Sequence, residues 1–126
     1  MRLLLDTHAL IWWVEDSPLL SQAARAAIAE NEVLVSAASA WEVTTKHRLG
    51  KLPSAKRIAL AFAAEVAAEG FVPLPVTLDH AALAGNLDIP HKDPFDRLLI
   101  AQARIERLPL VSNEALFDGF GVERLW

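Results

Sequence analysis

The sequence contains no cysteine and no long apolar run, and each absence excludes a class of protein. Without cysteine the chain cannot form a disulfide framework, a cysteine-ligated zinc site or a thiol nucleophile, which fits a reducing compartment. No run of about 18 apolar residues is present to span a bilayer. The apolar N-terminal segment is interrupted by Asp6 and His8, and no small-residue cleavage site follows it. We therefore expect a cytoplasmic protein without a signal peptide and without membrane contact.

Apolar residues are abundant, at 53% of the 126 residues, and the mean hydropathy is +0.27. This content excludes a disordered chain, because such chains have too little apolar surface to form a core. The length is that of one ordinary domain. Glycine and proline mark turns and no linker, and no internal repeat is present. We expect a single domain over residues 1–126.

Short apolar runs alternate with longer segments of helical periodicity. The runs typical of strands are Leu3–Leu5, Val33–Val35, Phe71–Leu74, Leu108–Val111 and Val122–Leu125. The helical segments are Ser21–Glu30, Ala37–Leu49, Ala55–Glu69, Asp79–Leu87 and Pro94–Arg107. Because parallel neighbouring strands need a crossover between them, this order predicts an α/β fold. We expect a short, mostly parallel five-stranded sheet covered by helices on both faces.

The segment Leu10–Val14 is apolar on every side and includes the adjacent Trp12 and Trp13. Neighbouring side chains of a helix point in different directions, so the two indoles cannot both face one core. Their apolar area is more than a small monomer is expected to bury. We therefore expect a partner surface to cover this segment.

The net charge of -4 has the wrong sign for binding nucleic acid by overall attraction. The charges are nevertheless uneven, because no acidic residue lies between Glu42 and Glu65. This interval carries a basic stripe, which consists of Lys46, Arg48, Lys51, Lys56 and Arg57. Considered alone, the stripe favours a solvated helix face and turn over phosphate binding, with which it is also compatible.

Acidic residues stand where predicted strands end and helices begin. Asp6 follows the first strand and precedes Thr7, and an N-cap role would account for it. Glu42 lies three residues after Ser39, which is the spacing of a capping box. Each of these acids therefore has a purely structural explanation when it is considered alone.

Two further acidic junctions lie in the C-terminal half. Asp93 occupies the N-cap position of the predicted long helix and Asp96 its first turn, where acids stabilise any helix. Ser112 and Glu114 follow the strand that ends at Val111. In a parallel sheet the carboxyl ends of the strands share one edge, so we expect the acids of all these junctions to converge there.

Carboxylates that are packed together raise one another's pKa, so a cluster of them at neutral pH favours a divalent cation. Oxygen ligands without cysteine favour Mg²⁺ or Mn²⁺ over zinc. The histidines show no paired metal-binding spacing, and we interpret them as polar surface groups or as supports for the acids: His8, His47, His80 and His91.

The chain resembles the PIN-domain ribonucleases, and most closely the VapC toxins of bacterial toxin–antitoxin modules, over essentially its whole length. The matching stretches are LLLDTHALIWW, VSAASAWEVTTKHRLGKL, IPHKDPFDRLLIAQA and LVSNEALFDGFGVERLW. The segment HKDPFDRLLIAQA is the most specific of them. The resemblance implies a three-layer α/β/α sandwich and an endoribonuclease that blocks translation by cutting particular RNAs.

By this resemblance Asp6, Glu42 and Asp93 match the first three acids of the family's metal site. We expect Asp6 and Asp93 to ligate Mg²⁺, for which Mn²⁺ can substitute, and Glu42 to hold a metal-bound water or a second ion. Thr7 would support this site.

The fourth acid of the family is usually an aspartate after a threonine or serine near the end of a late strand. This chain departs from that pattern, because Ser112 is followed by Asn113 and Glu114. Either Glu114 reaches the metal with its longer side chain, or Asp96 and Ser112 complete the site through water.

The resemblance also implies partners. These are an RNA substrate gripped by the basic stripe, a second copy of the chain across a two-fold interface, and a VapB-like antitoxin whose tail masks the acids.

Three other interpretations are open from the residues. A receiver domain would need an acidic pair after the first strand, whereas Asp6 is followed by Thr7, and a lysine after the last, where only Trp126 stands. A PIN-like nuclease that processes RNA and is no toxin would share the acids. A non-catalytic α/β binding domain would use them only as helix caps.

Overall fold

A computed structural model describes all of residues 1–126, and five strands form a single sheet in the order β3-β2-β1-β4-β5. Every neighbouring pair of strands is parallel. The strands are β1 (Arg2–Leu5), β2 (Glu32–Ser36), β3 (Val72–Leu74), β4 (Leu110–Val111) and β5 (Arg124–Leu125). The predicted five-stranded parallel sheet is therefore confirmed, with β1 at its centre.

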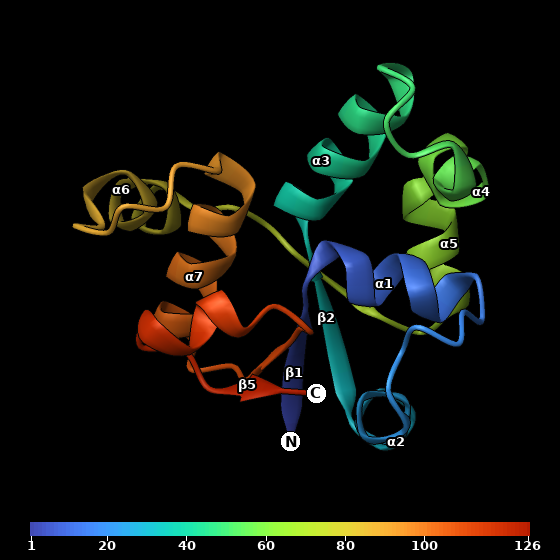
Figure 1. Ribbon diagram of the computed structural model, residues 1–126, viewed down its shortest axis with the longest axis horizontal. Helices are drawn as coiled ribbons and strands as arrows, with labels where there is room; N and C mark the ends of the chain where they lie inside the picture. The colour runs from blue at the N-terminus through green and yellow to red at the C-terminus, as the bar shows by residue number, and fades with distance from the viewer.

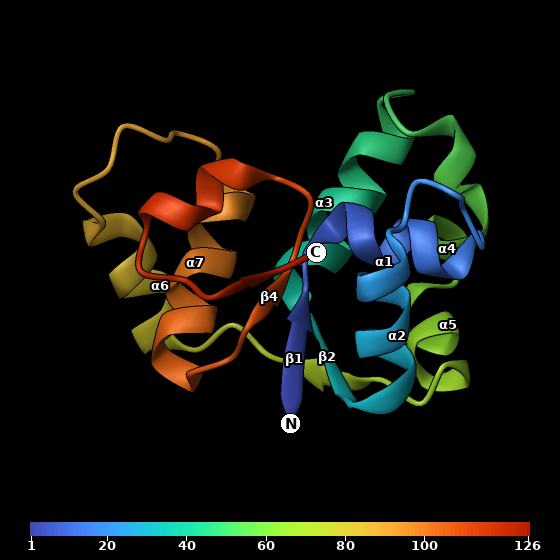
Figure 2. The same ribbon diagram turned by 60° about the horizontal axis from the view of Figure 1, so that its bottom comes forward.

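Helices connect the strands and cover both faces of the sheet. They are α1 (Thr7–Val14), α2 (Gln22–Glu30), α3 (Ala37–Arg48), α4 (Lys56–Leu60), α5 (Phe62–Ala68), α6 (Leu78–Asn86) and α7 (Pro94–Glu106). Two short 3-10 helices are η1 (Pro53–Ala55) and η2 (Ala115–Gly119). Figure 2 shows α1, α2, α4 and α5 on one side of the sheet and α6 and α7 on the other, which confirms the three-layer α/β/α sandwich. None of these helices has the length and apolar character needed to cross a bilayer.

The alternation of side chains along the strands builds two separate hydrophobic cores. Leu3 and Leu5 of β1 pack with residues of α1, α2, α4 and α5, whereas Leu4 packs with residues of α6 and α7. Successive strand residues point to opposite faces, and both faces are covered here. The strands are therefore almost entirely apolar and show no polar alternation.

The segment expected as one helix over Ala55–Glu69 is two helices, because the chain breaks at Ala61. Ala61 has φ -146° and ψ 49°, which no helical residue adopts. The break lets Ile58 of α4 and Val66 of α5 enter the same core. The apolar repeat continues across the break, so the sequence pattern carries no signal of it.

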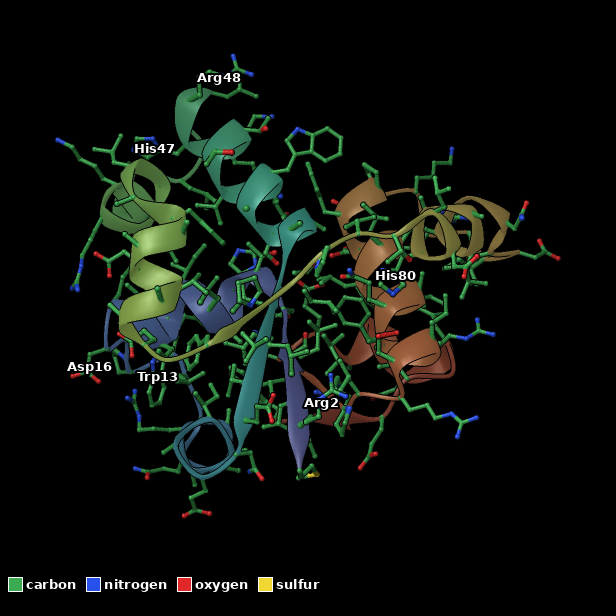
Figure 3. The ribbon with its side chains drawn as sticks, turned by 180° about the vertical axis from the view of Figure 1, so that it is seen from behind. Arg2, Trp13, Asp16, His47, Arg48 and His80 are labelled. Atoms are coloured by element: carbon green, nitrogen blue, oxygen red, sulfur yellow. The ribbon has the colours of Figure 1, made fainter.

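The chain itself covers part of the apolar segment Leu10–Val14, while Trp12 and Trp13 stay partly exposed, so the expected partner surface remains a prediction. Trp12 lies against Trp126, with ring centroids 5.8 Å apart, and Trp13 lies against Phe71 at 6.2 Å. The Trp13 indole nitrogen also donates a hydrogen bond of 2.9 Å to Glu69 (Figure 3). The two indoles thus pack on segments far away in sequence, which a local pattern does not reveal.

Candidate acidic active site

The acidic side chains come from four junctions at the carboxyl edge of the sheet. Figure 1 shows α1 and α3 beginning at the upper ends of β1 and β2, with α7 alongside. Asp6 caps α1 and accepts a hydrogen bond of 2.8 Å from the Ala9 backbone. Asp93 caps α7 and accepts one of 3.0 Å from the Asp96 backbone. The helix-cap explanation is therefore correct for both aspartates.

Asp6 is buried, with 4% of its surface exposed. Burial raises its pKa to about 6, although hydrogen bonds from the Ser112 side chain and the Ala9 backbone oppose the rise. The charge of Glu114 raises the pKa of Asp6 further. The junction after β4 therefore lies close to the junction after β1, as the parallel sheet requires.

Asp96, in the first turn of α7, also has a pKa raised to about 6, mainly by burial. The Nε2 atom of His91 lies 2.7 Å from its carboxylate and opposes the rise. The neighbouring charges of Asp93, Glu114 and Glu42 raise the pKa. The acids of the four junctions thus influence one another's charge, and at Asp6 and Asp96 burial and neighbouring acids outweigh the groups that lower the pKa.

Glu42 differs from these aspartates because the chain itself binds both of its carboxylate oxygens. Oε1 accepts a hydrogen bond of 2.6 Å from the Thr7 hydroxyl, and Oε2 pairs with the Lys46 ammonium. The Ser39 hydroxyl lies 3.0 Å from that of Thr7. The predicted capping box of Ser39 and Glu42 is wrong, because α3 begins earlier and is capped by Ser36. Glu42 therefore points into the acidic cluster and not back along its own helix.

Lys46 belongs to the acidic cluster, although the sequence places it in the basic stripe. Burial opposes its charged form, but the hydrogen bond and charge of Glu42 outweigh burial and raise its pKa, with added contributions from Asp93 and Asp96. The ammonium is therefore an internal counterion for the site.

The rest of the basic stripe is divided as well. Arg57 pairs with Glu65 of α5 at 3.0 Å. Arg48, Lys51 and Lys56 are exposed and form no ion pair, and Arg48 points away from the sheet at the outer end of α3 (Figure 3). Two of the five cations, Lys46 and Arg57, are thus paired with carboxylates, and the other three are not.

Arg97, for which the sequence pattern predicted no role, organises the loop before α7. Its guanidinium donates hydrogen bonds to the backbone carbonyls of Leu87 at 2.6 Å, His91 at 2.8 Å and Ala84 at 2.9 Å. This clamp holds the loop that carries His91 and leads into Asp93. Arg97 lies within the specific segment HKDPFDRLLIAQA, and this position is the one feature of the sequence that could have pointed to its role.

The interpretation of the histidines is correct in part. His91 supports Asp96, whereas His80 is buried at 2% exposure and is no surface group. The Nδ1 atom of His80 accepts a hydrogen bond from the Thr77 backbone and completes a capping box for α6. His80 thus accepts the hydrogen bond of the Thr77 backbone N–H, a role that the spacing of the histidines in the sequence did not predict.

The chemistry of the acids fits a hard divalent cation. Their donors are carboxylate oxygens only, and a bound cation would favour the ionised forms of Asp6 and Asp96. As the side chains are placed, no three His, Cys, Asp or Glu residues are grouped closely enough to hold an ion. Both carboxylate oxygens of Glu42 are already bound by Thr7 and Lys46.

Comparisons with known proteins agree with this architecture. The family model of the PIN domain matches residues 3–121. No curated protein sequence matches the chain. Among solved structures, the chain is similar to VapBC2 from Rickettsia felis bound to a DNA fragment from its promoter, with a TM-score of 0.68, 13% identity, and 98% of this chain and 97% of that chain covered.

Two further structures are similar. The first is FitAcB from Neisseria gonorrhoeae, with a TM-score of 0.64 and 18% identity over 98% of this chain and 96% of that one. The second is a toxin–antitoxin complex from Klebsiella pneumoniae, with a TM-score of 0.59 and 19% identity over 89% and 86%. At these identities the likeness concerns the fold.

Proposed function

This chain belongs to the PIN-domain family, and we propose that it is a divalent-metal-dependent endoribonuclease, the VapC-type toxin of a toxin–antitoxin pair. PIN domains are generally nucleases, which supports a hydrolase that acts on nucleic acid. The observation that carries the proposal is the convergence of Asp6, Glu42, Asp93 and Glu114, with Asp96 beside them, at the carboxyl edge of the sheet. A domain that used these acids only as helix caps would not need Glu42 or Glu114 there, because neither one caps a helix through its side chain.

The residues divide the work of phosphodiester hydrolysis between them. Mg²⁺, or Mn²⁺ in its place, supplies activation of water and neutralisation of phosphate charge when it is bound. Asp6 and Asp93 would hold the ion, with Glu114 as the third carboxylate. Thr7 and Lys46 fix both oxygens of Glu42, so Glu42 would orient a water molecule and would not need to ligate the ion.

The partners of the proposed toxin follow from the same site. The neighbours VapBC2 and the Klebsiella complex are toxin–antitoxin assemblies, which supports an antitoxin for this chain. An antitoxin arginine placed among Asp6, Asp93 and Glu114 would replace the cation and close the site. RNA is the proposed substrate and a homodimer the proposed assembly, both in the cytoplasm.

Cleavage of RNA by the purified chain tests the enzymatic part. Total RNA is incubated with Mg²⁺ or Mn²⁺ and with EDTA. We expect cleavage only with metal, and we expect Asp93→Asn to lose at least about 100-fold in rate, since a lost ligand costs several kcal/mol of charge stabilisation. Asp88→Asn is the matched control, because Asp88 is exposed and forms no hydrogen bond or ion pair through its side chain. Cleavage that persists in EDTA would contradict the metal mechanism.

Expression in bacteria tests the toxin part. We expect the wild-type chain to stop growth when it is produced alone, and Asp93→Asn or co-expression of the neighbouring reading frame to restore growth. A chain that cleaves RNA but leaves growth unchanged would be a PIN nuclease of another kind.

A further inference from the structure

Trp41 is an exposed tryptophan beside the acidic cluster. It keeps 56% of its surface exposed, whereas Trp12, Trp13 and Trp126 are half-buried against other parts of the chain. Trp41 directly precedes Glu42 on α3. The helix that buries Glu42 in the site therefore presents the indole at its border.

Phe95 meets Trp41 across the start of α7. The two rings lie edge to face, with centroids 4.8 Å apart and planes at 75°. Phe95 stands between Asp93 and Asp96 in sequence, so the aromatic pair connects the two helices that carry three of the acids. Neither ring belongs to the hydrophobic cores on the two faces of the sheet. The pair is therefore not explained by packing of the core.

A cation completes this surface. The Lys46 ammonium that pairs with Glu42 also lies 5.9 Å from the centroid of the Phe95 ring. Two aromatic rings and an ammonium thus border the carboxylates. Nucleobases stack on exposed aromatic side chains, and nearby cations attract the phosphates that accompany them.

We propose that Trp41 and Phe95 form a stacking platform for one unpaired nucleobase of the RNA substrate, next to the phosphate that is cleaved. This inference rests on the proposed nuclease function and adds how the substrate is held. The platform would require single-stranded RNA at this position, because a base within a duplex has no free face to stack on the indole.

The charges around the pair favour RNA over a second copy of this chain as the occupant. A two-fold contact centred on Trp41 would bring two copies of Glu42, Asp93 and Asp96 close to one another. Like charges placed together across an interface oppose association. A base with its phosphate avoids this conflict, since the divalent cation and Lys46 would lie between the phosphate and the carboxylates.

Binding measurements with Ca²⁺ in place of Mg²⁺ separate the platform from catalysis, because Ca²⁺ also takes oxygen ligands and keeps the carboxylates compensated. The probes are a fluorescein-labelled 12-nucleotide oligoadenylate and a ribose-phosphate oligomer of the same length without bases, and the readout is fluorescence anisotropy. We expect Trp41→Ala to weaken oligoadenylate binding by about 5- to 150-fold, the range for one stacked base, and to leave binding of the baseless oligomer unchanged. Trp41→Phe should retain most of the affinity, because it keeps a ring.

Leu78→Ala is the matched control. Leu78 is 90% exposed on α6, so this variant also removes an exposed apolar side chain, and it should bind both probes like the wild type. Thermal unfolding should report little change for Trp41→Ala, because Trp41 is outside both cores.

Two results would overturn the platform. One is equal binding of oligoadenylate by the wild type and Trp41→Ala. The other is a Trp41→Ala variant that no longer self-associates in light scattering but still prefers oligoadenylate over the baseless oligomer as strongly as the wild type does. Either result leaves metal-dependent RNA cleavage intact. Conversely, if the wild-type chain cleaves no RNA with any metal, the proposed function is wrong, whereas the binding measurement still reports whether Trp41 stacks on a base.

Discussion

The acidic edge of the sheet has two halves that handle their charge differently. On α3, Glu42 is buried but fully occupied, because Thr7 and Lys46 bind its two oxygens. Across from it, Asp6 and Asp96 have pKa values raised to about 6, because burial and neighbouring acids outweigh the hydrogen bonds and the histidines that oppose the rise. A buried charge is favoured when it is paired, so we expect an added cation to act mainly on the second half.

This contrast indicates where a ligand gains the most free energy. Binding of a cation beside Asp6 relieves a repulsion that folding itself created. Binding beside Glu42 would first have to displace Lys46. The four predictions below test whether the two halves behave in this way, from the largest expected effect to the smallest.

Removing the charge of Asp6 should stabilise the metal-free protein. The pKa of Asp6 is higher in the folded state than its ordinary value of 3.8, so the folded state binds more protons between these values and stability falls as pH rises from about 4 to about 6. Asp6→Asn removes this loss and still accepts the hydrogen bond from Ala9. We expect a gain of up to about 3 kcal/mol in the free energy of unfolding at pH 7.

Urea unfolding in EDTA at pH 4 and pH 7 measures this gain. The difference between wild type and Asp6→Asn should be small at pH 4, where the carboxyl group is protonated in the folded state, and should increase toward pH 7. Added Mn²⁺ should stabilise the wild type more than the variant. A variant that is less stable than the wild type at pH 7 would show that Asp6 already has its counterion.

Glu114 and Asp96 should differ in their effect on metal binding. The charge of Glu114 raises the pKa of both Asp6 and Asp96, whereas Asp96 already receives a hydrogen bond from His91. We therefore expect Glu114→Gln to weaken Mn²⁺ binding by about 10- to 100-fold, and Asp96→Asn to weaken it less. Calorimetry with Mn²⁺ measures both. The reverse order would assign the fourth acid to Asp96.

Lys46 and Glu42 should be coupled in stability. Lys46→Met leaves Glu42 buried without its cation, and Glu42→Gln leaves Lys46 without its anion, so the double variant should lose less than the sum of the two losses. We expect a coupling of about 1–2 kcal/mol, below that of a fully buried pair, because 30% of the Lys46 side chain is exposed. Urea unfolding of the four proteins measures it. If the losses in the free energy of unfolding are additive, the interaction between Lys46 and Glu42 does not contribute to stability.

Cations without an internal carboxylate should contribute most to RNA binding. Arg48, Lys51 and Lys56 form no ion pair, so replacing each with Gln should reduce the slope of log affinity against log salt by about 0.7 per phosphate contact. Arg57→Gln should change the slope less, because Arg57 is paired with Glu65. Anisotropy titrations of oligoadenylate at several salt concentrations measure these slopes. If the slope is unchanged in all four variants, these cations do not contact phosphates, and the exposed part of the stripe is only a solvated surface.

The parallel sheet and the positions of the acids were predictable from the sequence for a physical reason. Short apolar strands that alternate with helices allow few topologies, and in a parallel sheet every strand ends at the same edge. Asp6 and Glu114 follow the paired strands β1 and β4 and therefore lie near one another, whereas Asp93 follows α6 and is not placed by this argument. Helix caps are equally local, and Asp6 and Asp93 occupy the N-cap positions expected from the chain.

Charge compensation could not be predicted, because it depends on distances between segments that are far apart in sequence. The chain does not reveal locally that Lys46 turns toward the acids while Arg57 turns toward Glu65, although both lie in one basic interval. The contacts of Trp12 with Trp126 and of Trp13 with Phe71 also join segments that are far apart in sequence, so they could not be predicted either. The sequence by itself determined which junctions carry acids. Only the tertiary structure decided which acids keep an uncompensated charge, because burial and pairing are properties of the packed chain.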